Sequence, residues 1–220
     1  MKENEDVGRQ IKCYAAKEIQ HIQLSTKVQK VRIEGSVSDE IQVIWRDTAL
    51  RKLHLGQKED TLLLHDEAVP FLYGALGLIE LTKGNDLLLK IPFQYAGTVS
   101  IRTTTNKIRV VDCRLNGKLE IQTNTGAISL SGTLADYVSL NASHGVITCE
   151  HIKAKQSLHM ETITGFIECY LDRENQNYVF DCHSKHGSCH FPSANLDNNI
   201  QYEPCIVTAQ SVNGSIHVRY

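Results

Sequence analysis

The chain has 220 residues, of which 41% are hydrophobic and 22% are charged, and its formal net charge is −2. This composition is that of a folded globular protein and excludes a disordered or low-complexity chain. The small net charge gives no electrostatic reason to expect binding to nucleic acid. The length suits one large all-β domain, and we expect a single domain over residues 1–220.

The N-terminal sequence MKENEDVGRQ is acidic, whereas an export signal needs a basic start and an apolar core. The main apolar stretch without charge, residues 68–79, is too short to cross a bilayer. The seven cysteines are odd in number and contain no CxxC pair, which argues against a disulfide framework. We therefore expect a cytoplasmic protein with free cysteines and no transmembrane segment, or a cell-surface protein if a leader is missing from this sequence.

Residues 7–95 read as short strands separated by turns, in segments such as KVRIEGSVSDEIQVIW and DLLLKIPF. The stretch 68–79 interrupts this pattern and carries five large apolar residues: Val69, Phe71, Leu72, Leu76 and Leu78. Two interpretations of this stretch stay open. It either plugs the side or end of the core, or it forms an interaction patch for a protein partner or a second copy of the chain.

Residues 96–220 contain a repeat whose six copies share a Gly or Asn as anchor. The anchors are Asn106, Gly126, Gly145, Gly165, Gly187 and Gly214. Both residue types tolerate a positive φ, so we expect each anchor to lie in a turn. The positions seven and five before the anchor, and two and four after it, are apolar in every copy, while the positions between them are mostly polar. Each copy therefore predicts two short strands joined at a corner, with alternate side chains pointing inward.

A unit of about 20 residues cannot bury its own apolar face, but stacked units bury a continuous core. The repeat therefore predicts a β-solenoid, most simply a single-stranded β-helix in which each unit, or rung, stacks on the one before it. A β-sandwich or barrel is the alternative. The last rung ends at Tyr220 without a cap, so we expect it to stack on another copy or to be shielded by a side chain such as Tyr220.

The sequence LLLKIPFQYAGTVSIRTTTNKIRV, followed by LEIQTNTGAISL and VSLNASHGVITC, resembles the bacterial DUF4097 family, whose members are often labelled as candidate adhesins. The N-terminal EIQHIQLSTKVQKVRIEGSVSDEIQVIW is similar to the opening of that family. The resemblance implies right-handed winding of the solenoid. It implies no catalytic residue, because the family has none agreed. The chain departs from the family pattern at Asn106, which replaces Gly, and in the longer connection 192–205.

Cysteines occupy inward positions of the repeat. Cys149 and Cys169 take the same position in successive rungs, and Cys182 and Cys189 are both inward in the next rung. A buried free cysteine packs like a small apolar residue, so we expect the cysteines to fill the core. A Cys149–Cys169 disulfide is compatible with this pattern but suits only an oxidising compartment.

Glu168, His190 and His217 share one outward column, three residues after their anchors. Neighbouring strands lie about 4.8 Å apart, and a Glu/His/His set is able to bind a metal such as zinc. The other interpretation is a polar ladder exposed to solvent. Glu161 and His183 share a second outward column.

The chain lacks the P-loop, GxSxG, HExxH and GxGxxG motifs, and its outward columns show no tight acidic pair beside basic residues. We therefore predict a non-catalytic scaffold or interaction module that needs no cofactor and binds a protein partner or itself. An adhesin-like cell-surface or carbohydrate-interacting protein is the alternative, although the columns beside the anchors hold no aromatic side chain to stack on a sugar. A metal-dependent enzyme that uses Glu168, His190 and His217 is the third hypothesis.

Overall fold

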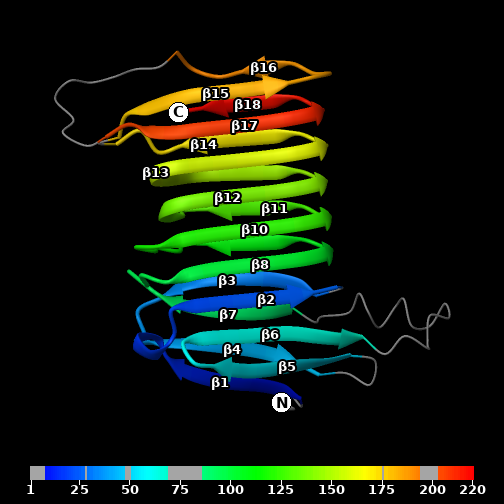
Figure 1. Ribbon diagram of the computed structural model, residues 1–220, viewed down its shortest axis with the longest axis vertical. Coiled ribbons are helices and arrows are strands. Elements are labelled where there is room, and N and C mark those ends of the chain that lie inside the picture. Colours follow the sequence, from blue (N-terminus) through cyan, green and yellow to red (C-terminus); the bar gives the residue numbers. More distant parts are fainter. Residues whose placement is uncertain (1–7, 28, 48–50, 69–85, 175, 194–202) are drawn as a thin grey trace, which may run out of the picture.

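The computed structural model describes residues 8–27, 29–47, 51–68, 86–174, 176–193 and 203–220. These residues form strands almost throughout, with one short 3-10 turn, η1 (Ala16–Glu18), and they stack along a long axis (Figure 1). The prediction of an all-β, solenoid-like fold is confirmed. Within the described ranges, no helix is long and apolar enough to cross a membrane.

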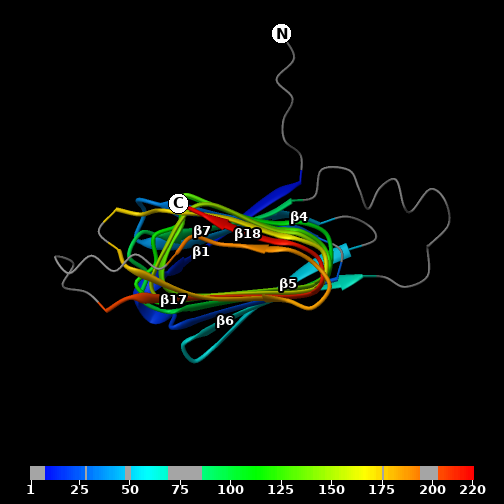
Figure 2. The same cartoon turned by 90° about the horizontal axis from the view of Figure 1, so that it is seen from above.

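Two layers of strands enclose the core when the stack is seen along its axis (Figure 2). Sheet A contains, in spatial order, β1 (Arg9–Ala15), β4 (Glu40–Arg46), β7 (Asp86–Pro92), β3 (Lys30–Ser36), β9 (Ile108–Val111), β11 (Ile128–Ser131), the first part of β13 (Ile147–Thr164), β14 (Ile167–Leu171), β18 (Ile216–Arg219) and β16 (Cys189–His190). Sheet B contains β5 (Arg51–Lys58), β6 (Thr61–Ala68), β2 (His21–Thr26), β8 (Thr98–Thr105), β10 (Lys118–Thr125), β12 (Leu134–His144), the second part of β13, β17 (Cys205–Asn213) and β15 (Tyr178–Ser184). Pairing is parallel except for β1–β4, β4–β7 and β5–β6 near the N-terminal end.

The apolar repeat positions lie in register and form the core. Ile121 pairs with Ile101 on one side and with Leu140 on the other. From Val99 to Cys169, every side chain at the four apolar repeat positions is at most 2% exposed. Burial of apolar area contributes about 25 cal/mol per Å², so this continuous column is the main source of stability.

The anchors form turns. Glycine was expected there because it tolerates a positive φ, and this reason is wrong for most of the anchors. Among the anchors only Asn106, with φ of 84°, and Gly165, with φ of 149°, have left-handed backbones. At Gly145 the constraint is close approach instead, because a Cβ atom there would overlap the carbonyl oxygen of Gly126 in the adjacent rung. A Cβ atom at Gly165 would overlap the carbonyl oxygen of Gly145 in the same way. The turns therefore stack too closely to leave room for a side chain.

The spatial order of the rungs differs from their chain order at the C-terminal end. β17 lies between β13 and β15, and β18 lies between β14 and β16 (Figure 1). The last rung of the sequence is therefore inserted, and β15 with β16 forms the end of the stack. The expectation that each rung stacks on its predecessor, so that the rung ending at Tyr220 is the last of the stack, is wrong here. In a parallel solenoid every rung presents the same strand edge, so the repeat pattern alone does not specify which neighbour it pairs with.

The N-terminal end shows the same arrangement. β2 lies between β6 and β8, and β3 lies between β7 and β9. The first parallel rung of the sequence is thus inserted between later strands. The antiparallel strands β1, β4 and β5 then close this end of the stack.

Aromatic rings cover the core at the C-terminal end. The Phe180 ring lies 6.2 Å from Tyr178, 6.1 Å from Phe191 and 6.0 Å from Tyr220, measured between ring centroids. The guanidinium of Arg173 lies 5.0 Å above the Tyr220 ring. Phe191 was predicted to point inward but is 45% exposed. Among the described residues no further rung covers it, since β15 and β16 form the end of the stack.

The cysteines fill the core with two exceptions. Cys113, Cys149, Cys169, Cys182 and Cys205 are buried, Cys189 is half-buried and Cys13 is exposed, and all seven are free thiols. Cys13 lies on β1, which is at the edge of sheet A and covers little of the core. The expectation that all the cysteines are core residues is therefore wrong for Cys13.

The buried thiols predict a loss of stability at alkaline pH. Burial raises the pKa of Cys113 and of Cys205 from 9.0 to about 12. Both thiols stay protonated in the fold while those of the unfolded chain ionise. Their contribution to the free energy of unfolding is therefore complete below pH 9 and is lost as the pH rises towards 12. The loss is about 1.4 kcal/mol per pH unit for each thiol. We expect Cys113→Ala to reduce the alkaline slope of the unfolding free energy, measured in urea, by that amount, and an unchanged slope would contradict the burial of this thiol.

Candidate functional site: the outer face of sheet B

Two polar columns run across the outer face of sheet B because alternate residues of each strand point away from the core. The first column is Gln23, Ser100, Glu120, Ser139, His159, Thr208 and Asp181. The second column is Ser25, Arg102, Gln122, Asn141, Glu161, Gln210 and His183. Between the two columns, each strand turns one residue such as Leu24 or Ile101 into the core, so the face is backed by rigid packing.

Most charged groups on this face have a partner. Asn141 Nδ2 donates a hydrogen bond to Glu161 Oε2 at 2.9 Å, and Lys118 Nζ lies 2.6 Å from Glu120 Oε1. At the end of the face, His183 Nε2 lies 2.8 Å from Asp181 Oδ1. Arg102 is exposed and forms no ion pair with any side chain in the described part of the chain. Among the described residues, its guanidinium is therefore an uncompensated positive charge on the face.

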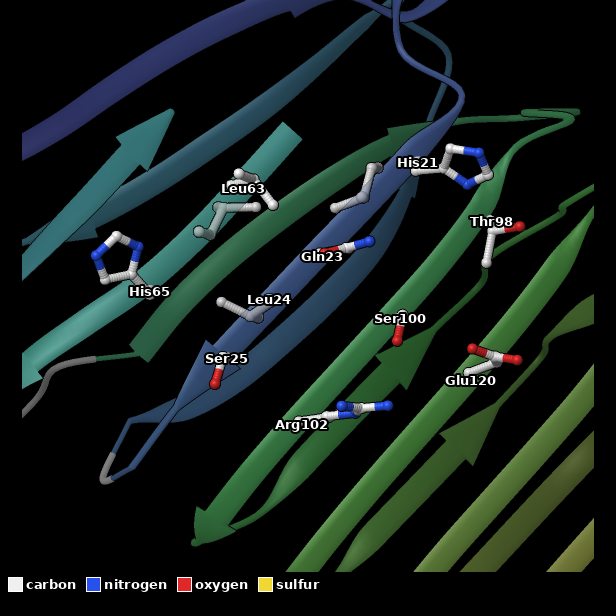
Figure 3. A pocket seen from close by; sticks show the side chains of 12 residues that line it. His21, Gln23, Leu24, Ser25, Leu63, His65, Thr98, Ser100, Arg102 and Glu120 are labelled. Atoms are coloured by element: carbon white, nitrogen blue, oxygen red, sulfur yellow. The ribbon is translucent and has the colours of Figure 1, made fainter. Parts of the chain in front are cut away.

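A groove of about 460 Å³ crosses the columns near the N-terminal end of sheet B (Figure 3). Gln23 and Ser25 of β2 lie at its centre, with His65 of β6 on one side and Arg102 of β8 on the other. In the view along the axis, the hairpin of β5 and β6 extends in part beyond the outline of the stacked rungs (Figure 2). A second hollow of about 250 Å³ continues from Arg102 towards Asn141.

The groove offers hydrogen bonds and one strong positive charge. An arginine guanidinium can donate two parallel hydrogen bonds to one carboxylate, and amide and hydroxyl groups such as those of Gln23 and Ser100 both donate and accept. The described residues that line the groove include no Phe, Tyr or Trp, and Glu120 is the one carboxylate among them. The chemistry of the groove therefore favours a polar ligand with a carboxylate.

The three residues of the metal hypothesis do lie in one column, but in an unexpected order. Glu168 pairs with His217, and His217 pairs with His190, because β18 is inserted between β14 and β16. The His190 and His217 rings are edge to face at 5.0 Å, and Glu168 Oε1 accepts a hydrogen bond from Tyr170 Oη at 3.2 Å. Within the described ranges, no three His, Cys, Asp or Glu side chains are placed to hold a metal ion. Metal binding by Glu168, His190 and His217 stays a prediction.

The inserted rung also separates the second predicted pair. Gln210 lies between Glu161 and His183 in their column. The apolar patch Val69, Phe71, Leu72, Leu76 and Leu78 lies outside the described residues. Its role as an interaction patch or a core plug stays a prediction.

The sequence pattern did not predict the groove. The groove brings together β2, β6, β8 and β10, which are distant in the sequence, and strand alternation says nothing about which of them are neighbours. The signal that was available is the polar character of Gln23 and Ser25 between buried residues.

The model of one protein family, Toastrack DUF4097, matches residues 19–169. The chain belongs to this family. The resemblance seen in the sequence is thereby confirmed. The Toastrack match includes β2, β6, β8 and β10, which carry the groove, and it ends before the two rungs that close the C-terminal end.

Solved structures share the fold of this Toastrack chain. A candidate cell adhesion protein from Clostridium sporogenes ATCC 15579 aligns with a TM-score of 0.57 and 13% identity, covering 96% of this chain and 98% of that one. A candidate adhesin from Bacteroides fragilis NCTC 9343 aligns with a TM-score of 0.51 and 14% identity, covering 98% of each chain. Identities this low show a common fold alone. The chain matches no curated protein significantly.

Proposed function

We propose that this Toastrack protein is a non-catalytic interaction module that binds an acidic segment of a partner protein in the groove of sheet B. The observation that carries the proposal is the uncompensated guanidinium of Arg102 beside a row of amide and hydroxyl groups. An acidic side chain would pair with Arg102, and the backbone of the partner would exchange hydrogen bonds with Gln23, Ser25 and Ser100.

The rigidity of the face supports a binding role. Ile22, Leu24, Val99 and Ile101 lie directly beneath the groove and are at most 2% exposed. Side chains held on a packed sheet lose little conformational freedom when a ligand binds, which increases affinity.

The arrangement of groups in the groove supports a non-catalytic role. Hydrolysis of a glycosidic bond needs two carboxylates, but the lining residues supply only Glu120, which is paired with Lys118. Among the described side chains, neither Ser25 nor Ser100 forms a hydrogen bond with a histidine, as an activated serine nucleophile does.

The alternative is an adhesin-like protein that binds an acidic carbohydrate at the cell surface. The structural neighbours named as candidate adhesins favour it, and Leu63 offers an apolar contact for a sugar ring. We prefer the protein partner because the described lining residues include no Phe, Tyr or Trp for stacking on a sugar. The seven free cysteines also suit a reducing, cytoplasmic location.

Calorimetric titration at low salt tests the protein partner and the carbohydrate alternative with one probe each. Poly-L-glutamate stands for the acidic protein segment and oligogalacturonate for the acidic sugar. We expect poly-L-glutamate to bind, and Arg102→Ala to weaken binding about tenfold or more, which corresponds to about 1.4 kcal/mol. Arg109→Ala is the matched control, because Arg109 is an exposed arginine of β9 on the opposite sheet. It should leave the affinity unchanged.

The outcomes separate the hypotheses. Binding of oligogalacturonate but not poly-L-glutamate, with loss in Arg102→Ala, favours the carbohydrate alternative. Equal losses in Arg102→Ala and Arg109→Ala would show only nonspecific attraction and would contradict a site in the groove.

A further inference from the structure

Two buried thiols face each other across neighbouring strands near the C-terminal end. Cys149 of β13 and Cys169 of β14 are register partners in sheet A, and neither is exposed to solvent. Of the seven cysteines, all of which the structure describes, these two alone are register partners.

The spacing of the strands suits a covalent bond between them. Neighbouring strands of a sheet lie about 4.8 Å apart, and disulfide-bonded residues have Cα atoms about 4.4–6.8 Å apart. Both side chains point into the same layer of the core, as their register and burial require. We propose that Cys149 and Cys169 form a reversible disulfide that locks two neighbouring rungs when the protein is in oxidising surroundings.

The chemistry needs an oxidant, for which a small-molecule disulfide such as oxidised glutathione suffices. One protein thiolate attacks a glutathione sulfur and releases a glutathione thiolate, and the second protein thiolate then displaces the remaining glutathione. In total, the two protein thiols lose two protons and two electrons, and one glutathione disulfide is reduced to two glutathione thiols.

The exchange cannot proceed easily within the intact fold. The Cys149 thiol and burial raise the pKa of Cys169 well above its ordinary value, so the reactive thiolate is scarce. We therefore expect the bond to form during folding, or when the C-terminal rungs open, and to persist afterwards because solvent does not reach it.

The disulfide gives the chain two forms of different stability. It closes a ring between rungs that are 20 positions apart in the sequence, which restricts the unfolded chain. The oxidised form should melt about 5–10 °C above the reduced form. The thiol form would be the cytoplasmic one and the disulfide form the one outside the cell.

Refolding in a glutathione redox buffer tests the proposal without requiring access to the folded core. The reduced, unfolded wild-type chain is refolded with reduced and oxidised glutathione, remaining thiols are alkylated, and the folded product is digested with trypsin without reduction. Trypsin places Cys149 alone in peptide 119–153 and Cys169 alone in peptide 156–173. We expect these two peptides to be joined and to separate when the digest is reduced.

Two variants serve as controls. Cys169→Ala should abolish the joined peptide and the rise in melting temperature. Cys113→Ala removes a buried thiol that has no cysteine as register partner, so the joined peptide should persist. Folded wild-type protein that yields both peptides separately alkylated would overturn the proposal. A link from peptide 119–153 to a peptide with Cys182 or Cys205 would overturn it as well.

Discussion

Gly145→Ala is expected to lower the free energy of unfolding by about 3 kcal/mol. The added Cβ atom would overlap the carbonyl oxygen of Gly126, and this oxygen belongs to the backbone of a neighbouring turn that cannot move without displacing its own rung. Gly56→Ala is the matched control, because a Cβ atom there meets nothing within 4 Å. It should change stability by no more than about 0.5 kcal/mol. Urea unfolding of the two variants measures the difference.

The comparison also tests which property of glycine the turns require. Gly145 is not among the residues with a left-handed φ, so a conformational penalty cannot explain a large loss there. Equal and small losses at Gly145 and Gly56 would show that the turns are not as closely stacked as the structure indicates.

Val207→Asp is expected to cost about 4 kcal/mol or more, because it places a carboxylate where no water can reach it. Val207 of β17 is fully buried and lies between Leu158 of β13 and Phe180 of β15. Val179→Asp is the control on the same sheet, since Val179 is 37% exposed and points outward. We expect that variant to change stability little, as measured by thermal and urea unfolding.

Hydrogen exchange of the wild-type protein checks the inserted order on which this prediction depends. β15 pairs with one strand only among the described residues, whereas β17 is paired on both sides. The amides of β15 should therefore exchange faster than those of β17, and Val207→Asp should remove the protection of both strands. Slower exchange in β15 than in β17 would indicate that the rungs stack in chain order instead.

The core of the fold could be predicted from the sequence because its signal is local and repeated. Ile101, Ile121 and Leu140 recur at the same distance before an anchor, and a period of two residues assigns each of them to the inner face. Equivalent polar side chains also meet across rungs, since Thr103 Oγ1 donates a hydrogen bond to Thr123 Oγ1 at 3.0 Å.

Features that depend on which strands are neighbours could not be predicted. Every rung has the same apolar pattern and is able to pair with any other. The periodicity of the sequence therefore does not indicate that β17 lies between β13 and β15. The order of Glu168, His217 and His190 follows from that insertion. The groove was missed for the same reason, since Arg102 and His65 are brought near each other by β2, which comes long before both in the sequence.

Mapping the binding surface by amide chemical shifts tests the central claim most directly. Poly-L-glutamate is titrated into the isotope-labelled protein, and the perturbed amides are assigned. We expect shifts in β2, β6, β8 and β10 around Arg102, none in β9 or β11 on the opposite sheet, and their disappearance in Arg102→Ala. Shifts centred on sheet A or on the C-terminal end would contradict the claim that the groove of sheet B is the binding surface.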